Sequence, residues 1–185
     1  FDDDNVIHVA GKIDPVSDAE TVETELMLSD LESLEKRVPA AQKKAAQGDK
    51  ENKLIAAVLL PALELLREGK PARLARPSDE EERRVFDQAQ LLTAKPVLYV
   101  ANVDEAALSD GNELSRALEA HALATGAGCV RICAKVEAEL VELDPEERKA
   151  FLAELGADAS GLDRLIREAY RLLDLISYFT AGPKE

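Results

Sequence analysis

The chain has 185 residues, of which 46% are hydrophobic and 4% aromatic, and its formal net charge is -14. This apolar content is enough to bury the core of one or two small domains, which excludes a disordered chain. The negative charge argues against general attraction to DNA or to an anionic membrane, because both are polyanions.

The first half of the sequence has the pattern of long amphipathic helices. After a short strand-like segment at 5–9, Asp14-Pro15 and a Ser17-x-x-Glu20 capping box predict the start of a helix. Apolar residues then recur in steps of three and four, which is typical of a heptad stripe on one helix face. The stripe comprises Met27, Leu31, Leu34, Val38, Ala41 and Ala45.

A second apolar pattern follows the break at Gly48-Asp49. It runs from Ile55 to Leu66 and ends before Gly69, where a helix would be expected to stop. Two such stripes joined by a short turn predict an antiparallel helical hairpin, similar to a coiled coil.

Two prolines and a third helix complete this region. Pro39 and Pro61 fall inside the predicted helices and predict kinks, because each removes a backbone donor. A capping box at Ser78-x-x-Glu81 predicts another helix, which runs to about Leu92.

From Pro96 onward, strand-like and helix-like segments alternate, an order that predicts parallel strands. Two parallel strands do not form a stable sheet alone, so most of the sheet is expected outside this sequence. The expected fold class is α/β, mainly helical. The predicted segments are a strand at 96–101, a helix at 112–125, a strand at 129–132, and helices at 137–142, 145–155 and 161–175.

The first of these strands ends in Asn102-Val103-Asp104-Glu105. Ligands of open α/β sheets bind where a parallel strand meets its following loop. An Asn amide both donates and accepts, so it can bracket the N6/N7 edge of adenine. The alternative interpretation is loop capping, since Asn and Asp often follow strands and satisfy local backbone groups.

Several other segments occur together with this motif, and in this order the chain closely resembles the YchF-type, or Obg-like, ATPase family of the P-loop GTPase superfamily. The resemblance runs from Phe1 to Glu185 but covers only the middle of that family's usual chain. It implies that the phosphate loop, the switch regions and the TGS domain lie outside this sequence, in which no G-x-x-x-x-G-K-[ST] occurs. The segments are residues 1–9 with Asp14-Pro15, 91–96, 133–137 and 178–185.

The resemblance implies a site for the nucleotide base. Asn102 and Glu105 would read the base, in a variant of the superfamily's Asn-Lys-x-Asp motif that hints at ATP over GTP. Val103 would lie beside the base as an apolar wall. The loop Cys133-Ala134-Lys135 resembles the Ser-Ala-Lys loop that closes the other side of the pocket.

Two residues near the start of the chain have implied roles as well. Phe1 would pack near the adenine ring, which needs only a flat apolar face. His8 would help position the attacking water, as a loop imidazole can near neutral pH. The alternative for His8 is a half-buried histidine on a short strand, and His121 is expected to be structural.

The implied organisation places part of the nucleotide-binding domain at 1–15, a helical hairpin insertion at 16–92 and the second half of the nucleotide-binding domain at 93–185. The intact protein would be a cytoplasmic, ribosome-associated ATPase linked to translation and redox state. Its cofactors would be ATP or GTP with Mg²⁺, whose protein ligands are expected outside this chain. Alone, the chain is expected to hydrolyse nothing.

The remaining charged and sulfur-containing residues add two expectations. Between Lys36 and Lys53, six basic residues against two acidic ones give a local excess of +4, either a solvated helix face or a surface for ribosome contact. Cys129 and Cys133 lack the spacing of a zinc site, so no metal site is predicted.

A second hypothesis comes from a different class of function. The chain would be a non-catalytic helical protein-interaction module whose heptad stripes form a docking surface. It accounts for the stripe and for the missing phosphate loop, but it leaves Asn102-x-x-Glu105 and Cys133-Ala134-Lys135 unexplained.

Overall fold

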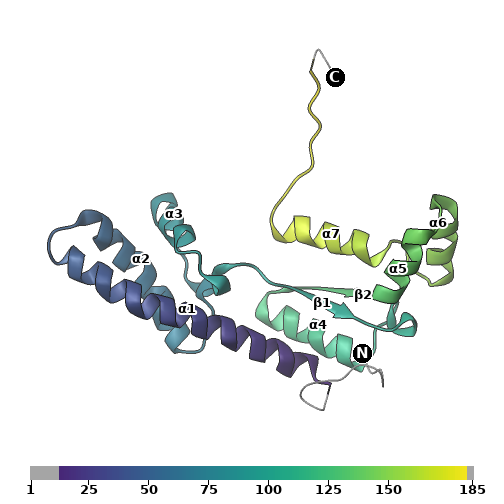
Figure 1. Ribbon diagram of the computed structural model, residues 1–185, viewed down its shortest axis with the longest axis horizontal. Helices are drawn as coiled ribbons and strands as arrows, with labels where there is room; N and C mark the ends of the chain where they lie inside the picture. The colour runs from purple at the N-terminus through teal and green to yellow at the C-terminus, as the bar shows by residue number, and fades with distance from the viewer. Residues whose placement is uncertain (1–12, 183–185) are drawn as a thin grey trace. The chain divides into compact units, whose positions relative to one another are not determined.

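The computed structural model describes residues 13–182 and divides into two compact units (Figure 1). Ser17–Pro96 form the helical unit, and the described residues on either side of this range form the sheet unit. Phe1, His8 and the predicted strand at 5–9 lie outside the described residues. The elements are α1 (Pro15–Ala45), α2 (Lys50–Arg67), η1 (Ala72–Leu74), α3 (Glu80–Gln88), η2 (Leu92–Ala94), β1 (Leu98–Asn102), η3 (Glu105–Ala107), α4 (Glu113–Thr125), β2 (Gly128–Ile132), α5 (Ala134–Glu142), α6 (Pro145–Glu154) and α7 (Gly161–Leu172).

The helical unit is built on α1 and α2, which lie side by side (Figure 1). Leu34 of the predicted stripe and Leu59 of α2 are both 0% exposed and belong to one apolar core. Pro39 and Pro61 are exposed, and each helix continues through its proline. The core also contains Val38, Val58, Ala62, Leu63, Leu66, Ala72, Phe86, Ala89 and Leu91.

A buried carboxylate fixes the segment after α3 onto α1. Asp30, which is 3% exposed, accepts hydrogen bonds from the backbone N of Leu92 and of Thr93, both at 2.8 Å. The Thr93 hydroxyl donates to the same carboxylate at 2.7 Å and accepts from the backbone N of Ala72 at 3.0 Å. One carboxylate therefore holds both short 3₁₀ turns, η1 and η2, against α1.

Two arginines add further connections within this unit. Arg73 of η1 forms an ion pair with Glu23 of α1 at 2.6 Å, and both side chains are less than one-fifth exposed. Arg37 donates from Nη1 to the backbone oxygen of Ala89, just after α3, at 2.9 Å. Both contacts bridge segments about 50 residues apart in sequence, which stabilises the packing of the later segments on α1.

Two of the predicted capping boxes are wrong in register. Helix α1 begins at Pro15, so Ser17 lies inside the first turn and is not the N-cap. Proline is well suited to a first helical position, because the N–H that it lacks would have no partner there. The N-cap of α3 is Asp79, whose side chain accepts from Glu82 N, whereas Ser78 donates to the Glu82 carboxylate.

The predicted end of α3 is also wrong. The helix ends at Gln88 rather than near Leu92. Gln90 takes a φ of +53°, which a right-handed helix excludes. The chain then enters η2, whose position is set by the hydrogen bonds to Asp30 and not by helix propensity.

In the sheet unit, β1 and β2 pair in parallel, which confirms the predicted strand order. The register runs from Leu98 opposite Gly128 to Asn102 opposite Ile132. The connection between the strands contains α4, because parallel neighbours need a crossover segment. In the described part of the chain the sheet has these two strands.

Helices α4 and α7 cover opposite faces of this sheet. Arg131 forms an ion pair with Glu119 of α4 at 2.7 Å, while the adjacent Ile132 contacts the start of α7 at Gly161. Successive strand residues point to opposite faces, so the two helices lie on either side (Figure 1). Tyr99 of β1 meets His121 of α4 edge to face, with ring centroids 5.8 Å apart, as expected for a structural histidine.

The ends of the other helices follow local chemistry. Asn112 and Ser115 form a reciprocal capping box at the start of α4, which ends at Gly126 in the left-handed region with a φ of 71°. Asp144 and Glu147 form a capping box at the start of α6, with Pro145 in the first turn. Helix α7 ends at Leu172 rather than 175, and Asp174 has a φ of +52°.

In the part of the chain that the structure describes, no helix combines the length and apolarity needed to cross a bilayer.

Candidate functional site

The candidate site lies at the carboxyl ends of β1 and β2. Because the strands are parallel, the loops that follow them emerge at the same edge of the sheet, where such sheets bind ligands. The ladder extends one residue past β1, since Val103 N donates to Ile132 O at 2.8 Å. This bond brings the loop after β1 alongside the loop after β2.

Asn102 connects the two loops directly. Its side-chain Oδ1 accepts a hydrogen bond from the backbone N of Ala134 at 3.1 Å, across 32 residues of sequence. Ala134 is the first residue of α5, whose leading N–H groups have no partner within the helix. The sequence analysis predicts that this helix begins at 137, whereas α5 begins at Ala134. The bond to Asn102 explains the earlier start.

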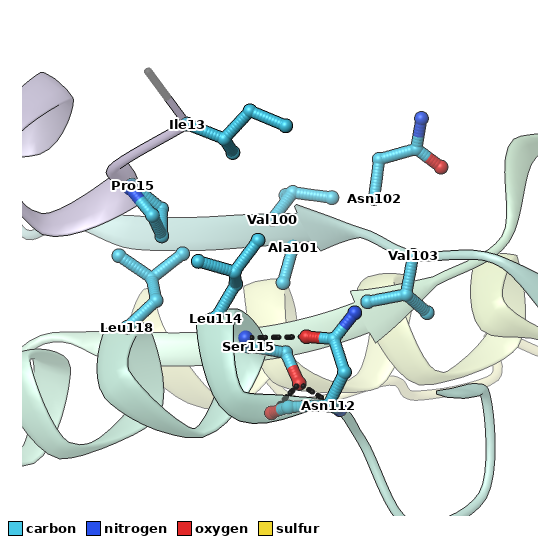
Figure 2. Close-up of a pocket in the computed structure, with 10 residues that line it drawn as sticks. All are labelled: Ile13, Pro15, Val100, Ala101, Asn102, Val103, Asn112, Leu114, Ser115 and Leu118. Carbon is cyan, nitrogen blue, oxygen red and sulfur yellow. Dashed lines mark hydrogen bonds between the residues drawn. The ribbon is translucent and has the colours of Figure 1, made fainter. Parts of the chain in front are cut away.

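The amide of Asn102 points away from α4. Figure 2 shows its side chain on the side of β1 opposite Asn112, while Val103 points toward Asn112 and the start of α4. Asn102 is exposed, with Oδ1 bonded to Ala134 and no partner for Nδ2 in the described residues. The Nδ2 group is therefore available as a donor to a ligand.

Val103 is 4% exposed and lines a small cavity between β1 and the start of α4 (Figure 2). The cavity has a volume of about 130 Å³ and a mainly apolar lining that includes Leu114 and Leu118. It is smaller than the ~300 Å³ at which ligand pockets usually begin. The side chain of Val103 thus packs against protein in this structure, and its contact with a base stays a prediction.

The loop after β1 turns immediately. Asp104 is the N-cap of η3, and its Oδ1 accepts from Ala107 N at 2.8 Å. Glu105 is the first residue of this 3₁₀ turn and its side chain is exposed. The turn therefore separates the roles of the two acidic residues: Asp104 shapes the loop, and Glu105 faces solvent.

In the loop after β2, the three residues singled out by the sequence have different environments. Cys133 is 3% exposed and packs inside, whereas Ala134 and Lys135 are exposed. The Lys135 side chain is 74% exposed, and its ammonium lies 4.0 Å from the carboxylate of Glu139, one helical turn later. The loop thus offers a backbone segment held by Asn102 and an exposed positive charge beside it.

Both cysteines are free thiols, and Cys129 lies on β2 away from the Asn102 loop. Burial, with a further contribution from the carboxylate of Glu119, raises the pKa of the Cys129 thiol. A thiol with a raised pKa stays protonated at neutral pH and is a poor nucleophile.

Two residues that shape the site are missed by the sequence analysis. The sequence analysis assigns no role to Asp104, although Asp before a short helical turn is a usual N-cap signal. Glu137 of α5 accepts from Gly161 N at 2.6 Å and Leu162 N at 3.3 Å, and so caps the start of α7. Its partners lie 24 and 25 residues away, so no local pattern indicates them.

Known proteins that share one name align with this chain over its whole length. The chain is 44% identical over 187 residues to the ribosome-binding ATPase YchF of Bacillus subtilis, and 43% identical over 185 residues to the protein of the same name from Escherichia coli O157:H7. These alignments cover 100% of this chain and 51% and 50% of the relatives. No protein-family model matches the chain.

A solved structure has the same fold. The Schizosaccharomyces pombe YchF GTPase superposes with a TM-score of 0.82 at 26% sequence identity, over 98% of this chain and 50% of that one. The chain therefore spans about half the length of the relatives that it matches. Since relatives at 31% to 44% identity align along all of it, the chain belongs to the YchF family.

Proposed function

We propose that the intact protein containing this chain is a nucleoside triphosphatase with a preference for ATP, and that the loops after β1 and β2 hold the base of the nucleotide. The observation that carries the proposal is the hydrogen bond from Ala134 N to Asn102 Oδ1 at 3.1 Å. It supports the proposal because it joins the two loops at the one edge where both candidate motifs lie. The names of the relatives, ATPase and GTPase, support the reaction class.

Asn102 would contribute one hydrogen bond to the base. Since Oδ1 already accepts from Ala134 N, the amide Nδ2 is the group left to donate. The N7 atom of a purine is an acceptor in both adenine and guanine. Asn102 would thus bind purines without distinguishing between them.

Glu105 would provide the preference for ATP. Adenine carries an N6 amino donor at the position where guanine carries the O6 acceptor. A carboxylate directed at this position accepts from N6 and is repelled by O6. Each good contact of this kind discriminates by about 1–3 kcal/mol, roughly a factor of 5 to 150 in affinity.

We assign only the base of the nucleotide to the described residues. Among residues 13–182, no group of three or more histidine, cysteine, aspartate or glutamate side chains could hold a metal ion. We assign the phosphates and Mg²⁺, which would neutralise phosphate charge, to parts of the protein beyond this chain, because the sequence has no G-x-x-x-x-G-K-[ST] phosphate loop. The proposed contacts of Phe1 with adenine and of His8 with water lie outside the described residues.

Contact with the ribosome would involve the turn between α1 and α2, which we propose to act as the end of a helical hairpin. Lys43, Lys44, Lys50 and Lys53 are all exposed around this turn, in a chain whose net charge is -14. Exposed lysines bind phosphate groups of RNA through charge alone. The relatives named ribosome-binding ATPase support the partner.

The alternative of a docking module receives less support. Leu34, Val38 and Ala41 of the predicted stripe are buried against the rest of the helical unit, so the stripe is already used in intramolecular packing.

Two substitutions in the intact protein test the base site. Asn102→Asp keeps an acceptor for Ala134 N but removes the Nδ2 donor, so affinity for ATP and GTP should fall together. Glu105→Gln supplies a donor for O6 and should shift the affinity ratio toward GTP by about tenfold. Equilibrium titration with fluorescent ATP and GTP analogues measures both. Unchanged affinities in both variants would contradict the assignment, and Glu142→Gln on α5 serves as an exposed control.

The ribosome surface needs a separate measurement. Lys43→Glu combined with Lys44→Glu should weaken ribosome co-sedimentation and reduce its salt dependence, while nucleotide affinity stays unchanged. Lys149→Glu, an exposed lysine on α6 in the sheet unit, is the matched control. Equal co-sedimentation of the double variant and the control would refute the role of the turn.

A further inference from the structure

A second cavity lies on the sheet unit, at the outer edge of β2 and away from the Asn102 loop. Its volume is about 320 Å³, which is within the range of small-ligand pockets. Three arginines and two glutamates contribute to its wall, together with the Cys129 thiol. The charged residues are Glu119, Arg131, Arg164, Arg167 and Glu168.

The backbone at this edge has groups free for a ligand. Gly128 N donates to Val97 O, and Ile132 O accepts from Val103 N, so these residues face β1. Alternate residues of a parallel strand face opposite neighbours, and Cys129 and Arg131 therefore direct their backbone groups outward. In the described part of the chain no strand pairs with this edge.

The charges in the cavity do not cancel. Arg131 is satisfied, with Nε 2.7 Å from Glu119 Oε1 and Nη1 donating to Ser109 O at 2.9 Å. Glu168 lies 4.0 Å from Arg171, its partner on the outer side of α7. Arg164 and Arg167 have no acidic partner among the described residues.

Arg164 is the unusual member of this set. Its Nε and Nη2 atoms are buried and have no hydrogen-bond partner in the described residues. A buried donor without an acceptor is costly, and a buried guanidinium more so than a neutral group. These two nitrogens form one side of the guanidinium fork, the side that holds the two oxygens of a carboxylate or phosphate in parallel hydrogen bonds.

We propose that this cavity binds an oxyanion, a carboxylate or phosphate group, with the buried Nε and Nη2 of Arg164 as paired donors and Arg167 as a second positive charge. Such a group would satisfy the unpartnered nitrogens and balance both arginines. The outward N–H groups at Cys129 and Arg131 would extend contacts to a larger ligand. The Cys129 thiol, protonated at neutral pH, adds no opposing charge.

The test measures binding of two probes to the intact protein by isothermal titration calorimetry at constant ionic strength. Inorganic phosphate and succinate are titrated separately, with saturating ADP present so that the nucleotide site does not take up phosphate. Arg164→Gln should weaken the binding of whichever probe binds by at least tenfold. Glu168→Gln should strengthen it, because this substitution removes a negative charge from the cavity wall. Lys149→Gln, on the exposed surface of α6, should leave it unchanged.

The outcomes separate the sources of the anion. Phosphate binding that depends on Arg164 identifies a phosphate ligand, and succinate binding that depends on it identifies a carboxylate. Arg164→Lys keeps the charge but not the fork, so intermediate weakening in a variant with an unchanged circular dichroism spectrum shows that the loss is not unfolding. If neither probe binds, or if Arg164→Gln and Lys149→Gln bind equally well, the proposal is overturned.

Discussion

Replacing the buried carboxylate of Asp30 should destabilise the helical unit more than any surface change on α1. The carboxylate accepts three hydrogen bonds between 2.7 and 2.8 Å, two of them from the backbone of η2. Asp30→Ala removes all three acceptor contacts and leaves the Thr93 N–H buried without a partner. Leaving a buried donor unsatisfied costs about 1–3 kcal/mol, so the total loss should be about 3–5 kcal/mol.

Asp30→Asn tests the two oxygens of the Asp30 carboxylate separately, because they have different partners. Oδ1 accepts only from Leu92 N, whereas Oδ2 accepts from both Thr93 N and the Thr93 hydroxyl. An amide that keeps its oxygen at the second position retains two of the three bonds and places an NH₂ group against Leu92 N. The loss should then be about 1–2 kcal/mol, smaller than for alanine.

The assay combines urea unfolding with amide hydrogen exchange in the native state. The unfolding midpoint should fall in the order control, Asp30→Asn, Asp30→Ala, with Glu25→Ala as the exposed control on the same helix. Exchange at Thr93 and Ala72 should accelerate in Asp30→Ala, because the Thr93 hydroxyl links these two segments. If Asp30→Ala unfolds at the same urea concentration as Glu25→Ala, the network does not stabilise the fold and the reasoning is refuted.

Two further outcomes follow from the structure. Asn52 donates hydrogen bonds to the Asp49 carboxylate from its backbone N and its side-chain Nδ2, and these bonds hold the pKa of that carboxyl below its ordinary value of 3.8. The ionised carboxylate therefore stabilises the folded state fully above pH 3.8, and this stabilisation is lost as the pH falls through the lower pKa of the folded state. Acid unfolding followed by circular dichroism should therefore show a smaller loss of stability below about pH 4 in Asp49→Asn than in the wild type; identical profiles would contradict the effect. In Gly161→Ala, the new Cβ would lie 2.8 Å from Glu137 Oε1 and 2.9 Å from Ile132 Cγ2, so thermal unfolding should show a loss of about 1–3 kcal/mol. Gly182→Ala, with nothing within 4 Å, should unfold like the wild type, and a Gly161→Ala variant equal to it would show that the contact relaxes freely.

The apolar periodicity of the sequence predicts the buried faces well, since burial of a helix face depends on the spacing of its own residues. Leu34 and Val38 lie in the core as the stripe predicts. Alternation of strands and helices likewise predicts the parallel pair, because a crossover helix leaves few other arrangements.

Helix ends are predicted less well when two residues compete for the same role. At 78–82 the chain offers Ser78-x-x-Glu81 and Asp79-x-x-Glu82, two capping patterns one residue apart. Ser and Asp have nearly equal N-cap preference, so the sequence alone does not choose between them. The structure uses Asp79 as the cap and turns Ser78 toward Glu82.

Local sequence patterns do not predict the contacts between segments that lie far apart in the chain. Asp30 stands in the sequence as one acidic residue on a helix, and its partners follow 62 and 63 residues later. The motif at Asn102 is visible in the sequence, but its bond to Ala134 requires the parallel register of β1 and β2. The sequence therefore identifies residues of the candidate site without showing which of their atoms remain free.

The bond between Asn102 and Ala134 also links base binding to the folding of the sheet unit. The same amide that would donate to a purine holds the first N–H of α5, and α5 carries Glu137, which caps α7. A base that orders Asn102 would therefore stabilise α5 and α7, because ligand binding stabilises the structure that it requires. The helical unit has its own core and its own buried carboxylate at Asp30, so this route gives it no added stability. Nucleotide should accordingly slow amide exchange at Ala134 and Gly161 but not at Thr93, and equal protection of all three would argue that the two units respond as one.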